Sequence, residues 1–152
     1  MNIVFTDFAM QTQSYDIFFS GCSANPKCEG CHNPEAWSFD CGQNWETYKR
    51  KMDLDLRTFK SVIKRIFILG GEPLDQSYEE FRKFINWISL YGIELWLFTR
   101  HDFDSISEDT KNLFDYIKCG RYMPEYSTEN NIQYGVKLAT SNQNIYKRGV
   151  HY

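Results

Sequence analysis

The sequence predicts an α/β fold with a mostly parallel sheet. Short apolar runs alternate with stretches of helical periodicity, which is the order expected of strand–helix–strand units. The chain has 152 residues, of which 42% are hydrophobic and 17% aromatic. That length supplies one packed core and is too short for two ordinary domains, so we expect a single domain over residues 1–152.

The first half of the chain contains two predicted strands and one predicted helix. Residues 15–20 form a strand-like run that leads into a cysteine-containing loop, and residues 35–53 have no clear period and are expected to be irregular. Residues 55–64 are predicted as a helix because apolar side chains recur there at helical spacing. The apolar run 65–69 ends at a pair of glycines, as a buried strand does.

The second half repeats this alternation. Ser77 and Glu80 have the spacing of a helix capping box, and the helix that they begin is expected to end at Gly92. Ser105 and Glu108 repeat the spacing ahead of another helical segment. Extended segments are predicted over residues 93–98, 116–119 and 135–138. About three strand–helix units therefore follow the cysteine loop.

The cysteine loop carries the strongest chemical signal. Cys22, Cys28 and Cys31 follow one another with the spacing C-x5-C-x2-C. Thiolates are soft ligands that suit zinc and iron–sulfur clusters, and clustered cysteines in a chain without secretory features indicate metal binding rather than disulfides. Three interpretations are open at this point: a cluster held by three cysteines, with one iron left open, a closed zinc site with Cys41 as the fourth ligand, or thiols that are inert or redox-active.

A second group of residues, Gly70, Gly71, Glu72 and Pro73, stands at the carboxyl end of the predicted strand 65–69. Ligands of open α/β sheets bind beyond the carboxyl ends of the strands, and glycines let the backbone approach a ligand closely. The carboxylate beside them could receive a cationic amino group. Alone, this pattern is more often a strand-ending turn, but beside a three-cysteine loop it is a much more specific signal.

Together the two motifs resemble those of the radical S-adenosylmethionine superfamily. The resemblance implies a compact partial (β/α) barrel in which the three cysteines of the loop hold a [4Fe-4S] cluster. It also implies that S-adenosylmethionine chelates the open iron, and that segment 70–73 helps to hold the amino group of this cofactor. Members of the superfamily usually have the spacing C-x3-C-x2-C, so this loop contains two additional residues.

Within the superfamily, the chain is most similar to the activating enzymes of anaerobic ribonucleotide reductase. The similarity rests on residues 18–22 and 30–34 around the loop, on a strand that ends in Thr99, and on residues 141–143. It implies that Thr99 and Asn142 contribute to the cofactor site. It further implies that the reduced cluster cleaves S-adenosylmethionine to a 5'-deoxyadenosyl radical, which removes a hydrogen atom from a glycine of the large reductase subunit. An external electron donor such as flavodoxin or ferredoxin is implied, and this chemistry needs no general acid or base, so no catalytic side chain is assigned.

Composition and charge exclude other classes. The net charge of −3 argues against a nucleic-acid-binding surface, because phosphate binding relies on clustered Lys and Arg. No apolar stretch is long enough to span a bilayer and no signal peptide is recognised, so we expect a cytoplasmic protein with no membrane partner. Two other functions stay open: a radical enzyme that acts on a small molecule or peptide, and a zinc-stabilised binding module that uses Cys41.

Overall fold

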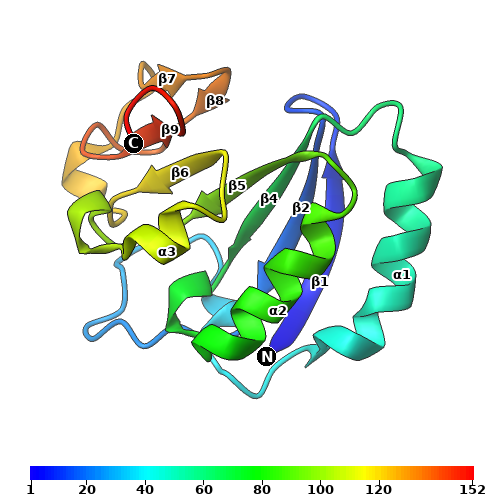
Figure 1. The fold of residues 1–152 in the computed structure, drawn as a ribbon. Coiled ribbons are helices and arrows are strands. Elements are labelled where there is room, and N and C mark those ends of the chain that lie inside the picture. The colour runs from blue at the N-terminus through cyan, green and yellow to red at the C-terminus, as the bar shows by residue number, and fades with distance from the viewer.

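The computed structural model describes all 152 residues, and its main feature is one seven-stranded sheet with the order β3-β1-β2-β4-β5-β6-β9 (Figure 1). The strands are β1 (Asn2–Ala9), β2 (Ser14–Phe19), β3 (Gln43–Asn44), β4 (Arg65–Gly70), β5 (Glu94–Phe98), β6 (Tyr116–Cys119) and β9 (Asn144–Lys147). A separate hairpin consists of β7 (Ile132–Gln133) and β8 (Val136–Lys137). The helices are α1 (Trp45–Thr58), α2 (Tyr78–Ser89) and α3 (Glu108–Lys111), and four 3-10 helices cover Pro34–Ala36, Pro73–Asp75, Phe103–Ser105 and Pro124–Tyr126.

The centre of the sheet is parallel. Strands β2, β4, β5 and β6 pair in parallel, whereas β1 and β9 run antiparallel to their neighbours. The predicted α/β class is therefore confirmed, and the four predicted central strands are present with ends shifted by at most one residue. The sheet is open, with β3 and β9 at its edges, and a barrel is not shown.

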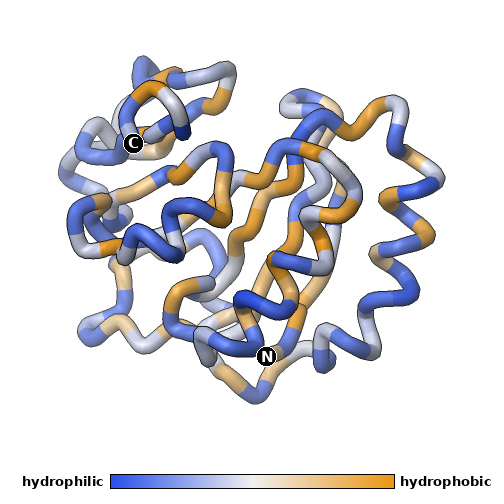
Figure 2. The backbone as a smooth tube through the Cα atoms, viewed as in Figure 1, coloured by the Kyte–Doolittle hydropathy of each residue, from blue (hydrophilic) through white to orange (hydrophobic).

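The two faces of the sheet are covered differently. One face packs against α1 and α2 in the main core, which contains Ile17, Ile66 and Leu97 from the strands and Phe84 from α2. On the other face, a smaller cluster that includes Trp96 covers only the half formed by β4, β5, β6 and β9. Figure 2 shows hydrophobic residues along the central strands, while α2 alternates hydrophobic and hydrophilic residues as a one-sided helix does. The β1–β2 half of the second face has no helix over it.

Helix α1 corrects two predictions. It begins at Trp45, inside the segment that was expected to be irregular, because the side chain of Asn44 accepts a hydrogen bond from the Glu46 amide (2.9 Å) and so caps the helix. Its buried side chains include Trp45, Met52 and Leu56, which recur at intervals of seven and four residues. The predicted helix 55–64 was correct only for residues 55–58, because α1 ends at Thr58 and residues 59–62 form turns.

The capping predictions were also wrong in detail. Ser77 is the N-cap residue of α2, but its side chain makes no capping hydrogen bond, and Glu80 instead accepts one from the Met1 amine (2.6 Å). Helix α3 is capped by Ser107, whose hydroxyl accepts from the Thr110 amide (3.3 Å), whereas Ser105 belongs to the preceding 3-10 helix.

Strands β1 and β9 flank the parallel centre and were not predicted. The predicted extended segment 135–138 contains β8, which pairs with β7. None of the helices has the length and apolar character needed to cross a membrane. The parallel strands therefore bring four loops to the end of the sheet at which their carboxyl ends lie, and β1 extends the helix-free face beyond them.

Candidate iron-sulfur site

A cavity of about 280 Å³ lies beyond the carboxyl ends of β2, β4, β5 and β6. This is the edge at which open parallel sheets bind their ligands. The loop after β2 brings the cysteines to it, the turn after β4 brings the glycines, and β5 ends beside it. The residues of the predicted site that line the cavity are Cys22, Cys28, Cys31, Gly70, Gly71, Glu72 and Thr99.

The three cysteines are free thiols held by a network of backbone contacts. The Cys22 amide donates to the carbonyl oxygen of Trp37 (3.1 Å), and the Cys31 amide donates to that of Cys28 (3.2 Å). The indole Nε1 of Trp37 donates to Cys31 Sγ (3.3 Å). The loop is therefore closed on itself, and one sulfur already has a hydrogen-bond donor, as ligand sulfurs of iron–sulfur clusters do.

Close backbone contact joins the cysteine loop to the Gly-Gly-Glu-Pro turn. The Glu72 amide donates to the Gly21 carbonyl oxygen (2.7 Å), and the Gly71 amide donates to that of Phe19 (2.8 Å). A Cβ atom on Gly71 would lie 2.2 Å from the Gly21 carbonyl oxygen, so no side chain fits there. Gly70 has a φ of +118° and passes equally close to the backbone of Phe19. The two glycines thus hold the loop against the end of β4.

Glu72 is the buried carboxylate of the site, with 1% of its surface exposed. Its oxygens accept hydrogen bonds from the Leu74 amide (3.1 Å), the Thr99 hydroxyl (2.7 Å) and the Arg100 amide (2.8 Å). Burial raises the pKa of Glu72, and these three donors oppose the rise. Because an ionised carboxylate has about four acceptor positions, roughly one is left for a ligand. Pro73 does not line the cavity and instead begins the 3-10 helix Pro73–Asp75.

The structure places Asn142 differently from the prediction, outside the residues that line the cavity. Its Nδ2 donates to the Arg121 carbonyl oxygen (2.9 Å), while its Oδ1 is buried without a partner. The neighbouring Gln143 does line the cavity, and its Nε2 donates to the Gly120 carbonyl oxygen (3.2 Å). Segment 141–143 therefore reaches the site through Gln143.

Three cationic residues of the cavity, Lys118, Arg100 and Lys137, were missed by the sequence analysis, and Lys137 is ion-paired with Glu129. Lys118 is the one charged residue in β6, and burial lowers its pKa to about 8. Its Nζ donates to the Gly120 carbonyl oxygen (3.0 Å). Arg100 forms ion pairs with Asp75 (3.0 Å) and, through its Nε, with Glu72 Oε2 (3.8 Å), and this Nε is buried and makes no hydrogen bond. A single lysine inside an otherwise apolar strand was the signal in the sequence, because a buried charge needs a partner.

The remaining cysteines do not join the site. The Cys41 thiol donates to the carbonyl oxygens of Glu35 (3.3 Å) and Ser38 (3.0 Å) and does not line the cavity. Cys119 lies in the main core, where burial raises the pKa of its thiol to about 12. The structure therefore offers three thiols to a ligand, and Cys41, the fourth ligand of the predicted zinc site, is not beside them.

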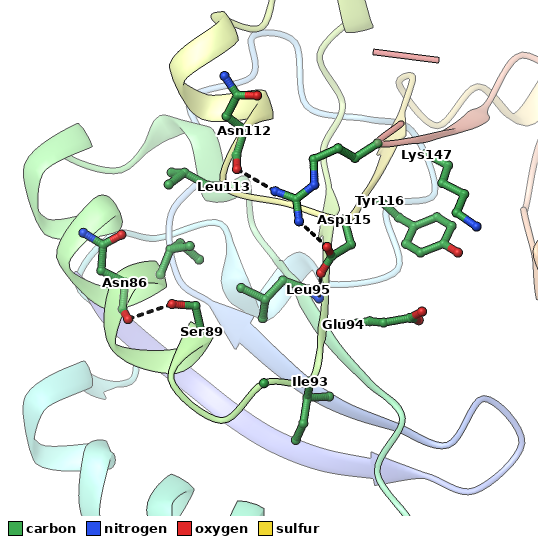
Figure 3. A pocket seen from close by; sticks show the side chains of 13 residues that line it. Asn86, Ser89, Ile93, Glu94, Leu95, Asn112, Leu113, Asp115, Tyr116 and Lys147 are labelled. Carbon is green, nitrogen blue, oxygen red and sulfur yellow. Dashed lines mark hydrogen bonds and ion pairs between the residues drawn. The ribbon is translucent and has the colours of Figure 1, made fainter. Parts of the chain in front are cut away.

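A larger cavity of about 580 Å³ lies at the opposite edge of the sheet, between α2 and the starts of β5 and β6 (Figure 3). Arg148 donates to the Asn112 carbonyl oxygen (2.9 Å) and forms an ion pair with Asp115, which in turn accepts from the Leu95 amide (2.9 Å). The charges of Arg148 and Asp115 are thus paired with each other, and no cysteine or histidine lines the cavity.

The donor set of the smaller cavity suits a [4Fe-4S] cluster. No group of three or more Cys, His, Asp or Glu side chains converges on one ion position, which a structural zinc site would require. In a cluster each thiolate binds a different iron, so the three sulfurs need not converge.

Comparison with known proteins agrees with this chemistry. No curated protein matches the chain significantly. Residues 13–146 match the model of the 4Fe-4S single cluster domain, a span that includes the cysteine loop, the Gly-Gly-Glu-Pro turn and all four parallel strands. The chain belongs to the family of 4Fe-4S single cluster domains and is an iron–sulfur protein.

Proposed function

We propose that this protein is a radical S-adenosylmethionine enzyme that activates a large anaerobic ribonucleotide reductase by forming a glycyl radical in it. One observation carries the proposal: the three-thiol loop and the Gly-Gly-Glu-Pro turn are joined by backbone hydrogen bonds and line the same cavity. A cluster protein that only transfers electrons could use the glycines to hold the loop, but it has no use for the free acceptor position of the buried Glu72. The open sheet corresponds, in this proposal, to a partial (β/α) barrel.

When bound and reduced, the cluster would pass one electron to the sulfonium of S-adenosylmethionine, which splits into methionine and a 5'-deoxyadenosyl radical that takes the hydrogen atom from a glycine Cα. Cys22, Cys28 and Cys31 would hold three irons and leave the fourth open. An external reductant such as flavodoxin or ferredoxin would supply the electron. Free thiols and a reducible cluster fit a cytoplasmic location.

The other residues of the cavity have positioning roles in this proposal. Gly70 and Gly71 allow the backbone to approach the cofactor, and the free acceptor position of Glu72 would receive its amino group. Lys118 and Arg100, whose Nε makes no hydrogen bond, would supply positive charge for its carboxylate. Leu69 and Phe98 form an apolar part of the wall, which keeps water away from the reacting atoms.

The test is product analysis of the protein reconstituted with iron and sulfide without oxygen. We expect the dithionite-reduced protein to convert S-adenosylmethionine to methionine and 5'-deoxyadenosine, and a Cys28→Ser variant to form neither. Mixing the active protein with an anaerobic reductase subunit should then give the doublet of a glycyl radical in electron paramagnetic resonance. A cluster-loaded protein that leaves S-adenosylmethionine intact would refute the proposal.

A further inference from the structure

The helix-free face of β1 and β2 carries two stacked aromatic rings. The rings of Phe5 and Phe18 lie 4.1 Å apart between centroids with an interplanar angle of 18°. Phe5 is 36% exposed, and neither ring belongs to a hydrophobic cluster of the protein. Stacked aromatics on an uncovered sheet face are apolar surface that a partner can bury.

The stack is continuous with the wall of the cavity. Phe5 pairs with Phe18 across β1 and β2, and Phe18 pairs with Leu69 across β2 and β4. Leu69 and Phe98 line the cavity, and Phe98 pairs with Lys118 across β5 and β6. One row of side chains on one face therefore runs from β1 into the cofactor cavity. Phe18 stands near the carboxyl end of β2, so a segment that runs along β2 and covers the stack leads toward the cavity.

Two carboxylates stand beside the stack, one row closer to the amino end of β2. Asp7 and Asp16 pair directly across β1 and β2, and like charges in that arrangement repel. Neither takes part in an ion pair, and the Asp16 carboxylate accepts only from the Ser14 hydroxyl (2.5 Å). Burial raises the pKa of Asp16, and the charge of Asp7 raises it further. The pair lacks a cation.

We propose that this face docks an extended, cationic segment of the polypeptide that supplies the hydrogen atom. A basic side chain of that segment lies between Asp7 and Asp16, and an apolar one covers the Phe5–Phe18 stack. The inference rests on the proposed function, because it identifies the segment as part of the macromolecular substrate. Beyond the proposed function, the inference specifies the charge of that segment and the order of its basic and apolar residues.

The geometry also specifies the spacing within the segment. Asp16 and Phe18 are two residues apart on one strand and point to the same face, which separates them by about 7 Å. Alternate side chains of an extended peptide have the same separation. The basic residue and the apolar residue are therefore expected at positions i and i+2 of the docked segment, with the hydrogen-donating residue toward the cavity.

Two synthetic peptides test this directly. The first is a fluorescein-labelled decapeptide that contains a central glycine, one arginine and a leucine two residues after the arginine. The second has glutamate in place of the arginine. Both are titrated with the reconstituted full-length protein, and binding is followed by fluorescence anisotropy. We expect the arginine peptide to bind and the glutamate peptide to bind at least about tenfold more weakly, the scale of one charge-assisted contact.

Variants locate the site. Asp16→Asn keeps the acceptor for Ser14 and removes the charge, and Phe5→Ser removes half of the stack. Each substitution should weaken the binding of the arginine peptide about tenfold. Leu54→Ser is the matched control, since Leu54 is 65% exposed on α1 and lies away from this face. Circular dichroism and iron content confirm that each variant is folded and loaded.

The outcomes separate the docking face from the proposed function. Absence of binding, equal binding of the two peptides, or wild-type affinity in the Asp16→Asn and Phe5→Ser variants would overturn the docking face. Formation of 5'-deoxyadenosine is measured on the same samples without peptide. If that product forms while the peptides fail, only the docking inference is wrong, whereas its absence refutes the proposed function by itself.

Discussion

Replacing Gly71 by alanine tests how the two motifs are joined. The new Cβ would lie 2.2 Å from the Gly21 carbonyl oxygen and 2.6 Å from that of Ala36, and both atoms belong to backbone that cannot move alone. Overpacking of this kind costs about 1–3 kcal/mol. Moving Gly21 also weakens its hydrogen bonds to the Glu72 amide and the Ala36 carbonyl oxygen, each 2.7 Å long and worth about 1 kcal/mol.

We therefore expect Gly71→Ala to lower the free energy of unfolding by about 2–4 kcal/mol, a large part of the total for a domain of this size. Urea denaturation followed by tryptophan fluorescence measures this change. Because the loop that holds Cys22 is displaced, iron and sulfide per chain after anaerobic reconstitution should fall below half of the wild-type value, roughly as expected when ligand geometry is lost.

The control is Gly92→Ala, at a glycine of φ +65° where an added Cβ atom would have no neighbouring atom within 4 Å. This substitution places alanine in a left-handed backbone conformation, which should lower the free energy of unfolding by about 1 kcal/mol, and it should leave the cluster content unchanged. A Gly71→Ala protein with wild-type stability and full iron content would show that close contact between the turn and the loop does not position the thiols.

Three further substitutions probe the site and the helix-free face. Cys41→Ser should leave the cluster content and its absorption spectrum unchanged, because this thiol faces loop carbonyl oxygens, and loss of metal would favour a fourth ligand. Trp37→Phe removes the donor to Cys31 Sγ and should lower the reduction potential by roughly 40 mV, the equivalent of about 1 kcal/mol, in a redox titration; an unchanged potential would contradict this. Asp16→Asn should raise the free energy of unfolding at pH 7 but not at pH 3. The pKa of Asp16 is raised in the folded protein, so this carboxyl stabilises the fold at a pH below its pKa in the unfolded chain, and that stability is lost as the pH rises through its pKa in the folded protein. Equal effects of the substitution at both pH values would contradict the assignment.

The sequence was sufficient for the centre of the fold and insufficient for its flanks. The four parallel strands are apolar runs bounded by glycine, turn residues or helical periodicity, so each is a strong local signal. Strand β1 mixes Asp7 and Thr6 with aromatics, and its partner β2 decides its place through pairing that local patterns do not encode. Helix α1 was misplaced because Phe59 and Val62, which suggested a buried face, are exposed, whereas the cap at Asn44 decides where the helix begins.

The candidate site divides in the same way. Cysteine spacing and a glycine pair are local, and the structure brings both to one cavity. Lys118 and Arg100 were not assigned, because their place in the cavity follows from the order of β4, β5 and β6 in the sheet. The choice between Asn142 and Gln143 depends on which of two adjacent side chains points inward, and hydrogen bonds to Arg121 and Gly120 decide it.

Electron paramagnetic resonance of the anaerobically reconstituted, dithionite-reduced protein addresses the joint claim of a three-cysteine cluster with an open iron that binds S-adenosylmethionine. We expect the signal of a reduced [4Fe-4S] cluster whose shape changes when S-adenosylmethionine is added. A silent sample that contains one zinc per chain would contradict the cluster itself. A cluster signal that S-adenosylmethionine leaves unchanged would contradict the proposed radical chemistry and leave an electron-transfer protein.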